Sequence, residues 1–343
     1  MIHRGNEMRI TFVNVGYGEA IWVECPQSGQ DNAFTILIDG GSNLDAEYAD
    51  CSTGRVRLLD YLKQSGVDHI DVMILSHIHE DHVCGLLPVA RQFPPKTLWQ
   101  GLPTDLHRHL PPMPSLRPAH PDRAKFADSL RDWQNLLLLV EKQGCNIRTL
   151  KSGDFLMPCA GMEIQSLAPT TQRVEELSKR IEDVFHTLDT ELFFQKLSAL
   201  DAAMNNFSLV LRLDWKGKRV LLPGDTNLAG YRDIPLEDLW AHIFKVGHHG
   251  QKDAADEALL RAVHPDVMVC CASSDRRYGS AWLELMELAE RLGIRVLYSD
   301  CPPLPAPLTT PPPHRALQLE LLPGQPMRIE YLGLEGDVLN GAL

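Results

Sequence analysis

Three histidines and an aspartate occur within six residues, in the segment His77-Ile78-His79-Glu80-Asp81-His82. The apolar run 72–75 directly before it has the length and aliphatic content of a buried strand. Because side chains alternate along an extended chain, the first two histidines should lie on one side. A turn would then let the aspartate and the third histidine face the same space. Imidazole and carboxylate suit zinc, manganese or iron, so the segment predicts ligands for two adjacent metal ions.

Two later apolar runs end in groups of the same kind. Asp225 follows residues 220–222 and a glycine, which permits close approach of the backbone, and its two oxygens could bridge two cations. His248 and His249 follow residues 243–246. Because neighbouring side chains of an extended chain point in opposite directions, only one of the two is expected to bind a metal directly.

These motifs resemble a known family. The His-x-His-x-Asp-His pattern, after an apolar strand and a serine, is similar to the metal-binding motif of the metallo-β-lactamase fold superfamily. The chain more specifically resembles the hydrolase domain of the ComEC/Rec2 DNA-uptake family and its free-standing relatives, over about residues 8–300. Besides the histidine motif, the segments that carry this resemblance follow in the family's order: 13–20, 37–41, 205–211, 221–225 and 245–250.

The resemblance implies an α/β fold, the αββα metallo-β-lactamase sandwich, with two divalent metal ions, zinc or manganese. Asp81, His249 and Asn205 are the implied catalytic groups, with His249 nearer the substrate. Asp39 is implied to orient a ligand imidazole through a hydrogen bond. The implied metal ligands are His77, His79, Asp81, His82, Asp225 and His248.

Several positions depart from the family pattern. Ser280 stands where a histidine would be expected, and Gln251 replaces a serine. No histidine can be assigned to the family's third metal-binding motif, and Asn205 is the polar group expected to line the site instead. The remaining histidines of the divergent stretch are expected in exposed loops or helices: His107, His109, His120 and His186.

The whole chain, 1–343, is predicted to be a single domain with a divergent insertion at 95–204 and a proline-rich loop or linker at 302–313. Within the insertion, residues 171–204 carry apolar residues at helical spacing. Packing on the protein's own core is the favoured interpretation of this stripe. A cap over the active site and a docking surface for a protein partner are the alternatives.

Composition indicates an ordinary enzyme without a membrane span. The chain has 343 residues, 44% of them apolar, and no stretch approaches the ~20 apolar residues that cross a bilayer. The N-terminus lacks a signal-peptide core, and eight scattered cysteines favour a reducing, cytoplasmic setting. The net charge of −12 argues against a broad nucleic-acid surface but leaves room for a small basic patch.

The predicted function is therefore that of a metal-dependent hydrolase, which uses metal-activated water as a phosphodiesterase or nuclease. Hydrolysis of a small ester or lactone is an alternative, because the ligands alone do not select the substrate. A further alternative is an interaction subunit of a multi-protein system, such as a defence system, whose partner would dock on 171–204.

Overall fold

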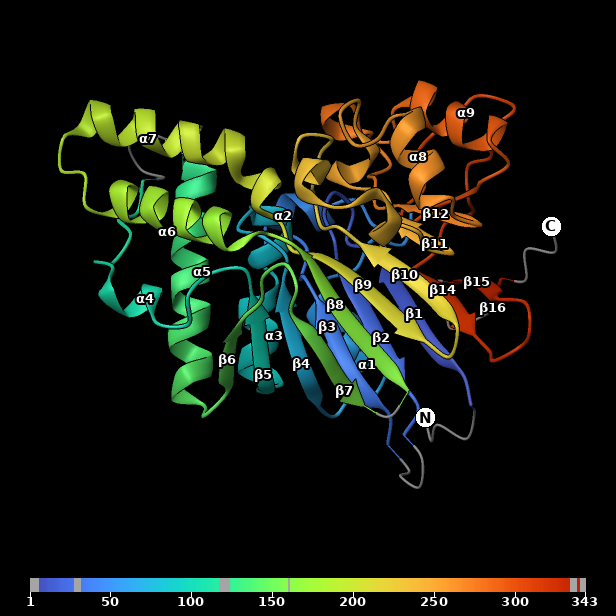
Figure 1. Cartoon of the computed structure of the whole chain (residues 1–343), viewed down its shortest axis with the longest axis horizontal. Coiled ribbons are helices and arrows are strands. Elements are labelled where there is room, and N and C mark those ends of the chain that lie inside the picture. Colours follow the sequence, from blue (N-terminus) through green and yellow to red (C-terminus); the bar gives the residue numbers. More distant parts are fainter. Residues whose placement is uncertain (1–5, 28–31, 117–123, 160, 334–337, 340–343) are drawn as a thin grey trace.

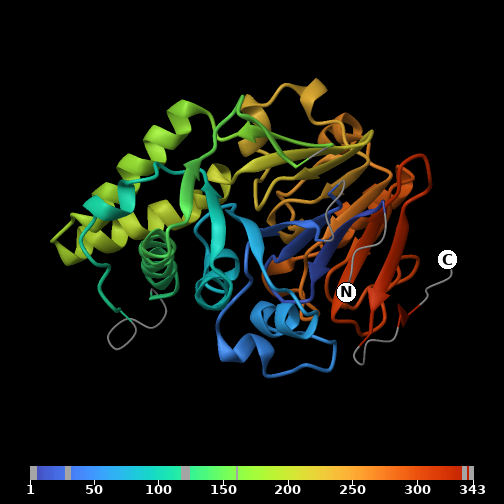
Figure 2. The same ribbon diagram turned by 90° about the horizontal axis from the view of Figure 1, so that it is seen from below.

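Two β-sheets pack face to face between two layers of helices, an arrangement seen from below in Figure 2. The computed structural model describes residues 6–27, 32–116, 124–159, 161–333 and 338–339. Three apolar cores separate the layers. One core lies between the first sheet and the helices before residue 204, a second between the sheets, and a third between the second sheet and the helices at 257–263 and 283–291.

The first sheet has nine strands in the order β16-β15-β14-β1-β2-β3-β4-β5-β6. Strands β3 to β6 run parallel to one another, whereas the other neighbouring pairs are antiparallel. In chain order the strands are β1 (Met8–Val13), β2 (Ile21–Cys25), β3 (Phe34–Ile38), β4 (Ile70–Leu75), β5 (Pro95–Gln100), β6 (Asn146–Thr149), β14 (Ala316–Leu321), β15 (Arg328–Leu332) and β16 (Val338–Leu339).

The second sheet has seven strands in the order β13-β12-β11-β10-β9-β8-β7. Strands β10 to β13 are parallel, and β7 to β10 are antiparallel. In chain order they are β7 (Phe155–Cys159), β8 (Met162–Ala168), β9 (Val210–Trp215), β10 (Lys218–Leu222), β11 (Ile243–Lys245), β12 (Val267–Cys270) and β13 (Arg295–Tyr298).

The helices form two groups. Figure 1 shows α5, α6 and α7 together at one end of the sandwich and α8 and α9 at the other. The α-helices are α1 (Leu58–Gln64), α2 (Glu80–Val83), α3 (Leu86–Gln92), α4 (Leu106–His109), α5 (Ala124–Lys142), α6 (Thr171–Phe185), α7 (Thr190–Ala203), α8 (Glu257–Val263) and α9 (Leu283–Arg291). Two 3-10 turns matter for the site, η3 (Met204–Phe207) and η6 (His248–Gly250).

The predicted αββα sandwich is confirmed. Residues 95–204 were expected to be an insertion, but they contribute strands β5 to β8 to the two sheets. Within this segment, helices α4 to α7 are the elements that lie outside the sheets. The segment 302–313 contains neither helix nor strand. That the whole chain is one domain stays a prediction.

The amphipathic stripe of 171–204 is divided between two antiparallel helices. Four of its six apolar residues are buried, namely Val174, Leu177, Ile181 and Val184, and the last three of these lie in the core on the helix side of the first sheet. The other two are exposed, since Leu188, in the turn between α6 and α7, is 97% exposed and Leu192 is 43% exposed. The structure thus places most of the stripe on the protein's own core.

Among the described residues, no helix is long and apolar enough to cross a membrane.

Candidate metal centre

The loops that carry the predicted ligands all leave the carboxyl ends of strands. Asp39 follows β3, the histidine motif follows β4, and Asp225 and the paired histidines follow β10 and β11. Parallel strands bring such ends to one edge of their sheet, and here the edges of both sheets meet. Close packing at this edge requires glycine at position 224, whose φ is +54° and where a Cβ would lie 2.8 Å from Cβ of Ser76.

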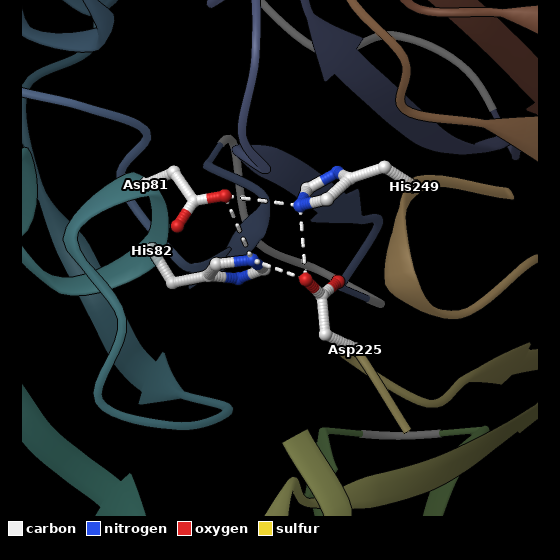
Figure 3. A group of neighbouring side chains, drawn as sticks. All are labelled: Asp81, His82, Asp225 and His249. Carbon is white, nitrogen blue, oxygen red and sulfur yellow. Dashed lines mark hydrogen bonds and ion pairs between the residues drawn. The ribbon is translucent and has the colours of Figure 1, made fainter. Parts of the chain in front are cut away.

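Four of the predicted residues form one buried group, shown in Figure 3. Asp81 and His82 come from helix α2, whereas Asp225 and His249 come from the segments that follow strands β10 and β11 of the second sheet. Nε2 of His249 lies 3.0 Å from Oδ2 of Asp81 and 2.9 Å from Oδ2 of Asp225. Nε2 of His82 lies 3.2 Å from Oδ2 of Asp225. Two carboxylates and two imidazoles therefore point their ligand atoms at one small space.

The far nitrogen of each of these imidazoles is anchored. Nδ1 of His82 donates to Oδ2 of Asp39 at 2.7 Å, and Nδ1 of His249 donates to the backbone oxygen of Cys271 at 2.7 Å. Each anchor fixes the ring and leaves Nε2 as the atom that faces the group. The contact expected for Asp39 is thus present in the structure.

His77 and His79 form a second pair beside this group. Oγ of Ser76 donates to Oδ2 of Asp39 at 2.5 Å, and it therefore accepts from Nδ1 of His77, which lies 3.0 Å away. Nε2 of His79 donates to Oδ1 of Asp201 at 3.1 Å. The two remaining nitrogens, Nε2 of His77 and Nδ1 of His79, lie 3.0 Å apart. When both rings are neutral and donate through their other nitrogens, these two nitrogens are both acceptors. Two lone pairs that face each other at this distance suit a bound cation.

Of the paired histidines, His249 lies in the buried group, whereas the sequence favoured His248 as the metal ligand. His249 is fully buried in the group, whereas Nδ1 of His248 contacts Oδ1 of Asp253 at 2.8 Å. Both histidines have positive φ, 44° and 51°. Such left-handed backbone at non-glycine residues costs free energy and is concentrated at functional sites. It also removes the alternation of an extended strand on which the sequence argument depended.

The charges of the group balance one another. Burial by itself would raise the pKa of Asp225, but His249, His82 and Lys245 outweigh it and hold that pKa well below its usual range. Burial by itself would lower the pKa of His249, but Asp225 and then Asp81 outweigh it and raise that pKa to about 9. In the metal-free protein Nε2 of His249 therefore carries a proton at neutral pH, shared with the two carboxylates.

This protonation predicts that metal binding releases protons. His249 must lose its proton before Nε2 can act as a ligand, so metal affinity should rise with pH until about pH 9. Titration calorimetry at pH 7 in buffers of different ionisation enthalpy should show proton release. The stability of the metal-free fold changes with pH in the opposite direction to metal affinity. The raised pKa of His249 stabilises this fold fully below about pH 6.5, and the stabilisation is lost as pH rises through about 9. Equal heats in all buffers would contradict the prediction.

The residues present fit divalent metal ions. Their inward-facing ligand atoms are nitrogen and carboxylate oxygen, which suit zinc and manganese. Oδ2 of Asp225 contacts Nε2 of both His82 and His249, whereas its Oδ1 lies 3.2 Å from Nζ of Lys245. Residues that would hold the ions are His77, His79, Asp81, His82, Asp225 and His249.

A cavity of about 390 Å³ opens onto the group. Asp81, Asp225, His79 and His248 reach its surface, and Lys125 of helix α5 is the one cationic side chain among its described lining residues apart from the histidines. Aromatic rings also line the cavity: Tyr17, Phe126 and Tyr278. Glu80 and Asp201 add two further carboxylates to the lining. The cavity therefore makes the group accessible from outside, with Lys125 as the one lysine of its described lining.

Residues 16–274 match the family model of the Metallo-beta-lactamase superfamily. The chain belongs to this superfamily. Members of the metallo-β-lactamase superfamily are metal-dependent hydrolases, so the predicted reaction class agrees with the family.

One curated relative is ComE operon protein 3 of Bacillus subtilis (strain 168), with 24% identity over 305 residues. The match covers 86% of this chain but 32% of that protein, so the chain spans about a third of the relative's length. Solved structures to which the chain is similar include a putative metal-dependent hydrolase from Parabacteroides distasonis, with 18% identity, a TM-score of 0.40, and 86% of this chain and 93% of that chain covered. Zn(2+)-bound PqqB from Methylobacterium extorquens has 11% identity and a TM-score of 0.43, with 85% and 97% covered.

The structure also brings residues to this metallo-β-lactamase site that the sequence did not indicate. Asp201 of α7 and Lys125 of α5 come from helices outside the sheets, where no motif marks them. Asn205 lines the cavity as expected, whereas the hydroxyl of Ser280 is fully buried. His107 is buried beside Glu141, and not exposed as expected, whereas His109 is exposed. His186 ends helix α6, and His120 lies outside the described residues.

Proposed function

We propose that the protein is a binuclear metal-dependent phosphodiesterase, with nucleotides or nucleic-acid ends as the substrate class. The observation that carries the proposal is the pair of buried carboxylates, Asp81 and Asp225, between histidines from both sheets and under a cavity that holds one lysine. The resemblance to the ComEC/Rec2 hydrolase domain also favours a phosphodiester. A broad nucleic-acid surface is not part of the proposal, because the net charge is −12.

Two divalent ions, when bound, lower the pKa of a water and stabilise negative charge at phosphorus. The protein's own groups do the rest. Asp81 reaches the cavity surface and can orient the attacking water or accept its proton. His248 presents its ring to the same cavity while Asp253 holds Nδ1, so that Nε2 is placed to protonate the leaving oxygen.

Lys125 is the group that would select a phosphodiester over a neutral ester. Its Nζ lies 3.6 Å from Oε2 of Glu80 and above the ring of Tyr278. Burial by itself would lower the pKa of Lys125, but Asp81 and Glu80 outweigh it and raise that pKa, so the side chain is cationic. A cation at this place can bind a non-bridging phosphate oxygen.

Purified protein loaded with zinc or manganese tests the proposal through its metal content and its hydrolysis of bis-p-nitrophenyl phosphate. We expect about two metals per chain, from the two ligand groups described above, and turnover that falls by roughly 10³-fold in Asp81→Ala. Asp214→Ala, on the far surface of strand β9, is the control and should retain full turnover. Two bound metals with turnover of p-nitrophenyl acetate but not of the phosphodiester would replace the proposal with the ester or lactone alternative.

Lys125→Ala separates the two substrate classes. Loss of a charged hydrogen bond worth about 1.5–3 kcal/mol should lower kcat/KM for the phosphodiester by roughly 10- to 100-fold. Any hydrolysis of p-nitrophenyl acetate should be unchanged, because a neutral ester does not use the lysine. Lys125→Arg is the matched control, since it keeps the charge. An equal loss on both substrates would show that Lys125 only maintains the structure.

The helical pair α6–α7 supports a second, weaker role as a docking surface for a protein partner. Leu188 and Leu192 are exposed at its tip, outside the core that buries the rest of the stripe. Replacing both with serine should leave turnover intact and abolish any assembly.

A reducing, cytoplasmic setting is also part of the proposal, supported by buried free thiols such as Cys84 and Cys270.

A further inference from the structure

The end of helix α7 and the turn η3 lie directly beside the first two histidines of the motif. Asp201 accepts from Nε2 of His79, as described above. Two residues later than η3, the backbone nitrogen of Leu209 donates to the backbone oxygen of Ser76 at 2.9 Å. Residues on both sides of position 205, Met204 and Phe207, line a small cavity together with His77. The helical pair outside the sheets thus ends against the metal centre.

Asn205 presents an unused oxygen at this place. Its Oδ1 is buried and has no hydrogen-bond partner in the part of the chain that the structure describes. Asn205 lies four residues after Asp201, and both line the main cavity together with His79. A buried amide oxygen without a partner costs free energy unless a ligand satisfies it. Among the described residues, Oδ1 of its neighbour Asn206 is likewise buried without a partner, but Asn206 lines another cavity, away from His79.

We propose that Oδ1 of Asn205 is a ligand of the metal ion that His77 and His79 would hold. Asp201 is a positioning residue that fixes the ring of His79 so that Nδ1 faces the ion. The proposal rests on the metal centre of the proposed function but not on its substrate. An amide oxygen is a harder ligand than imidazole, so this ion position should favour manganese over zinc more than an all-histidine position would.

Manganese and zinc titrations of the metal-free full chain, followed by calorimetry and by manganese electron paramagnetic resonance, test the proposal. Wild type should bind two manganese ions. Asn205→Ala should bind one with unchanged affinity and the other at least roughly tenfold more weakly, and Asn205→Asp should retain both because it keeps an oxygen. Asn205→His should raise the zinc-to-manganese affinity ratio of one position by roughly tenfold or more. Asp201→Ala should weaken the same position by roughly 10- to 100-fold.

Asn206→Ala is the matched control, because it removes a similar amide one residue away that faces another cavity. It should leave both manganese affinities unchanged. Full manganese binding by Asn205→Ala, or equal weakening in Asn206→Ala, would overturn the proposal. Loss of both ions in folded Asn205→Asp would also overturn it, because an oxygen at this position would then be insufficient.

The inference about the metal ligand and the proposed phosphodiester substrate can be contradicted independently of each other. If wild type binds two manganese ions and Asn205→Ala loses one, the inference stands even if no phosphodiester is hydrolysed. If turnover of bis-p-nitrophenyl phosphate is present but Asn205→Ala binds both ions normally, the proposed function stands and this inference fails.

Discussion

Replacing His249 with alanine is expected to reduce phosphodiester turnover by roughly 10⁴-fold and to remove one metal ion, whereas His248→Ala should reduce turnover by roughly 10²-fold with metal content unchanged. The difference follows from where the two neighbours point. Nε2 of His249 lies within 3.0 Å of carboxylate oxygens of both Asp81 and Asp225, whereas His248 faces the cavity and Asp253. Metal analysis beside steady-state kinetics measures both effects.

The pair of variants is its own control, because the two histidines share the same turn. The leaving group gives a further check on His248. If His248 protonates the leaving oxygen, His248→Ala should lose much more turnover with an alkyl leaving group than with p-nitrophenyl, which needs little protonation. Loss of metal in His248→Ala with full retention in His249→Ala would reverse the assignment and support the order expected from the sequence.

Lys245→Met is expected to lower the free energy of unfolding by about 3–5 kcal/mol. Lys245 is fully buried, and its Nζ contacts the carboxylate of Glu19, Oδ1 of Asp225 at 3.2 Å and the backbone oxygen of Gly224 at 2.7 Å. Methionine has a similar length but no charge, so Glu19 would remain buried without its partner. Burial already raises the pKa of Glu19, which shows how costly its charge is at this place. Urea denaturation of the metal-free protein measures the loss.

Adding Glu19→Gln to Lys245→Met should restore a large part of the lost stability, because removal of both charges leaves neither unpaired. Arg261→Met is a control for the removal of a cation, since Arg261 pairs with Glu257 on an exposed helix face and such pairs contribute little. If Lys245→Met were as stable as wild type, the buried pair of Lys245 and Glu19 would not stabilise the fold. If the double variant were less stable than the single one, hydrogen bonding and not charge would account for the loss.

The local sequence was sufficient to predict the strands that precede the candidate ligands. Apolar runs before His77 and Asp225 predicted β4 and β10, because a strand buried on both faces needs an almost continuous apolar sequence. Strands β6 and β7 gave no such signal. Their residues are mostly half-buried or exposed at the edges of the two sheets, so their sequences are mixed and residues 95–204 looked like an insertion.

The sequence by itself determined the order of the motifs and the types of side chain available as ligands, because these depend on residue types and short spacings. The αββα fold followed from the resemblance that these motifs carry. Only the tertiary structure decided which of His248 and His249 enters the group, since that depends on left-handed backbone that the alternation rule does not describe. It also placed Asp201 and Asn205 beside His79, and Lys245 between Glu19 and Asp225. These contacts join residues that are far apart in the chain, and packing of the two sheets and the α6–α7 pair brings them together.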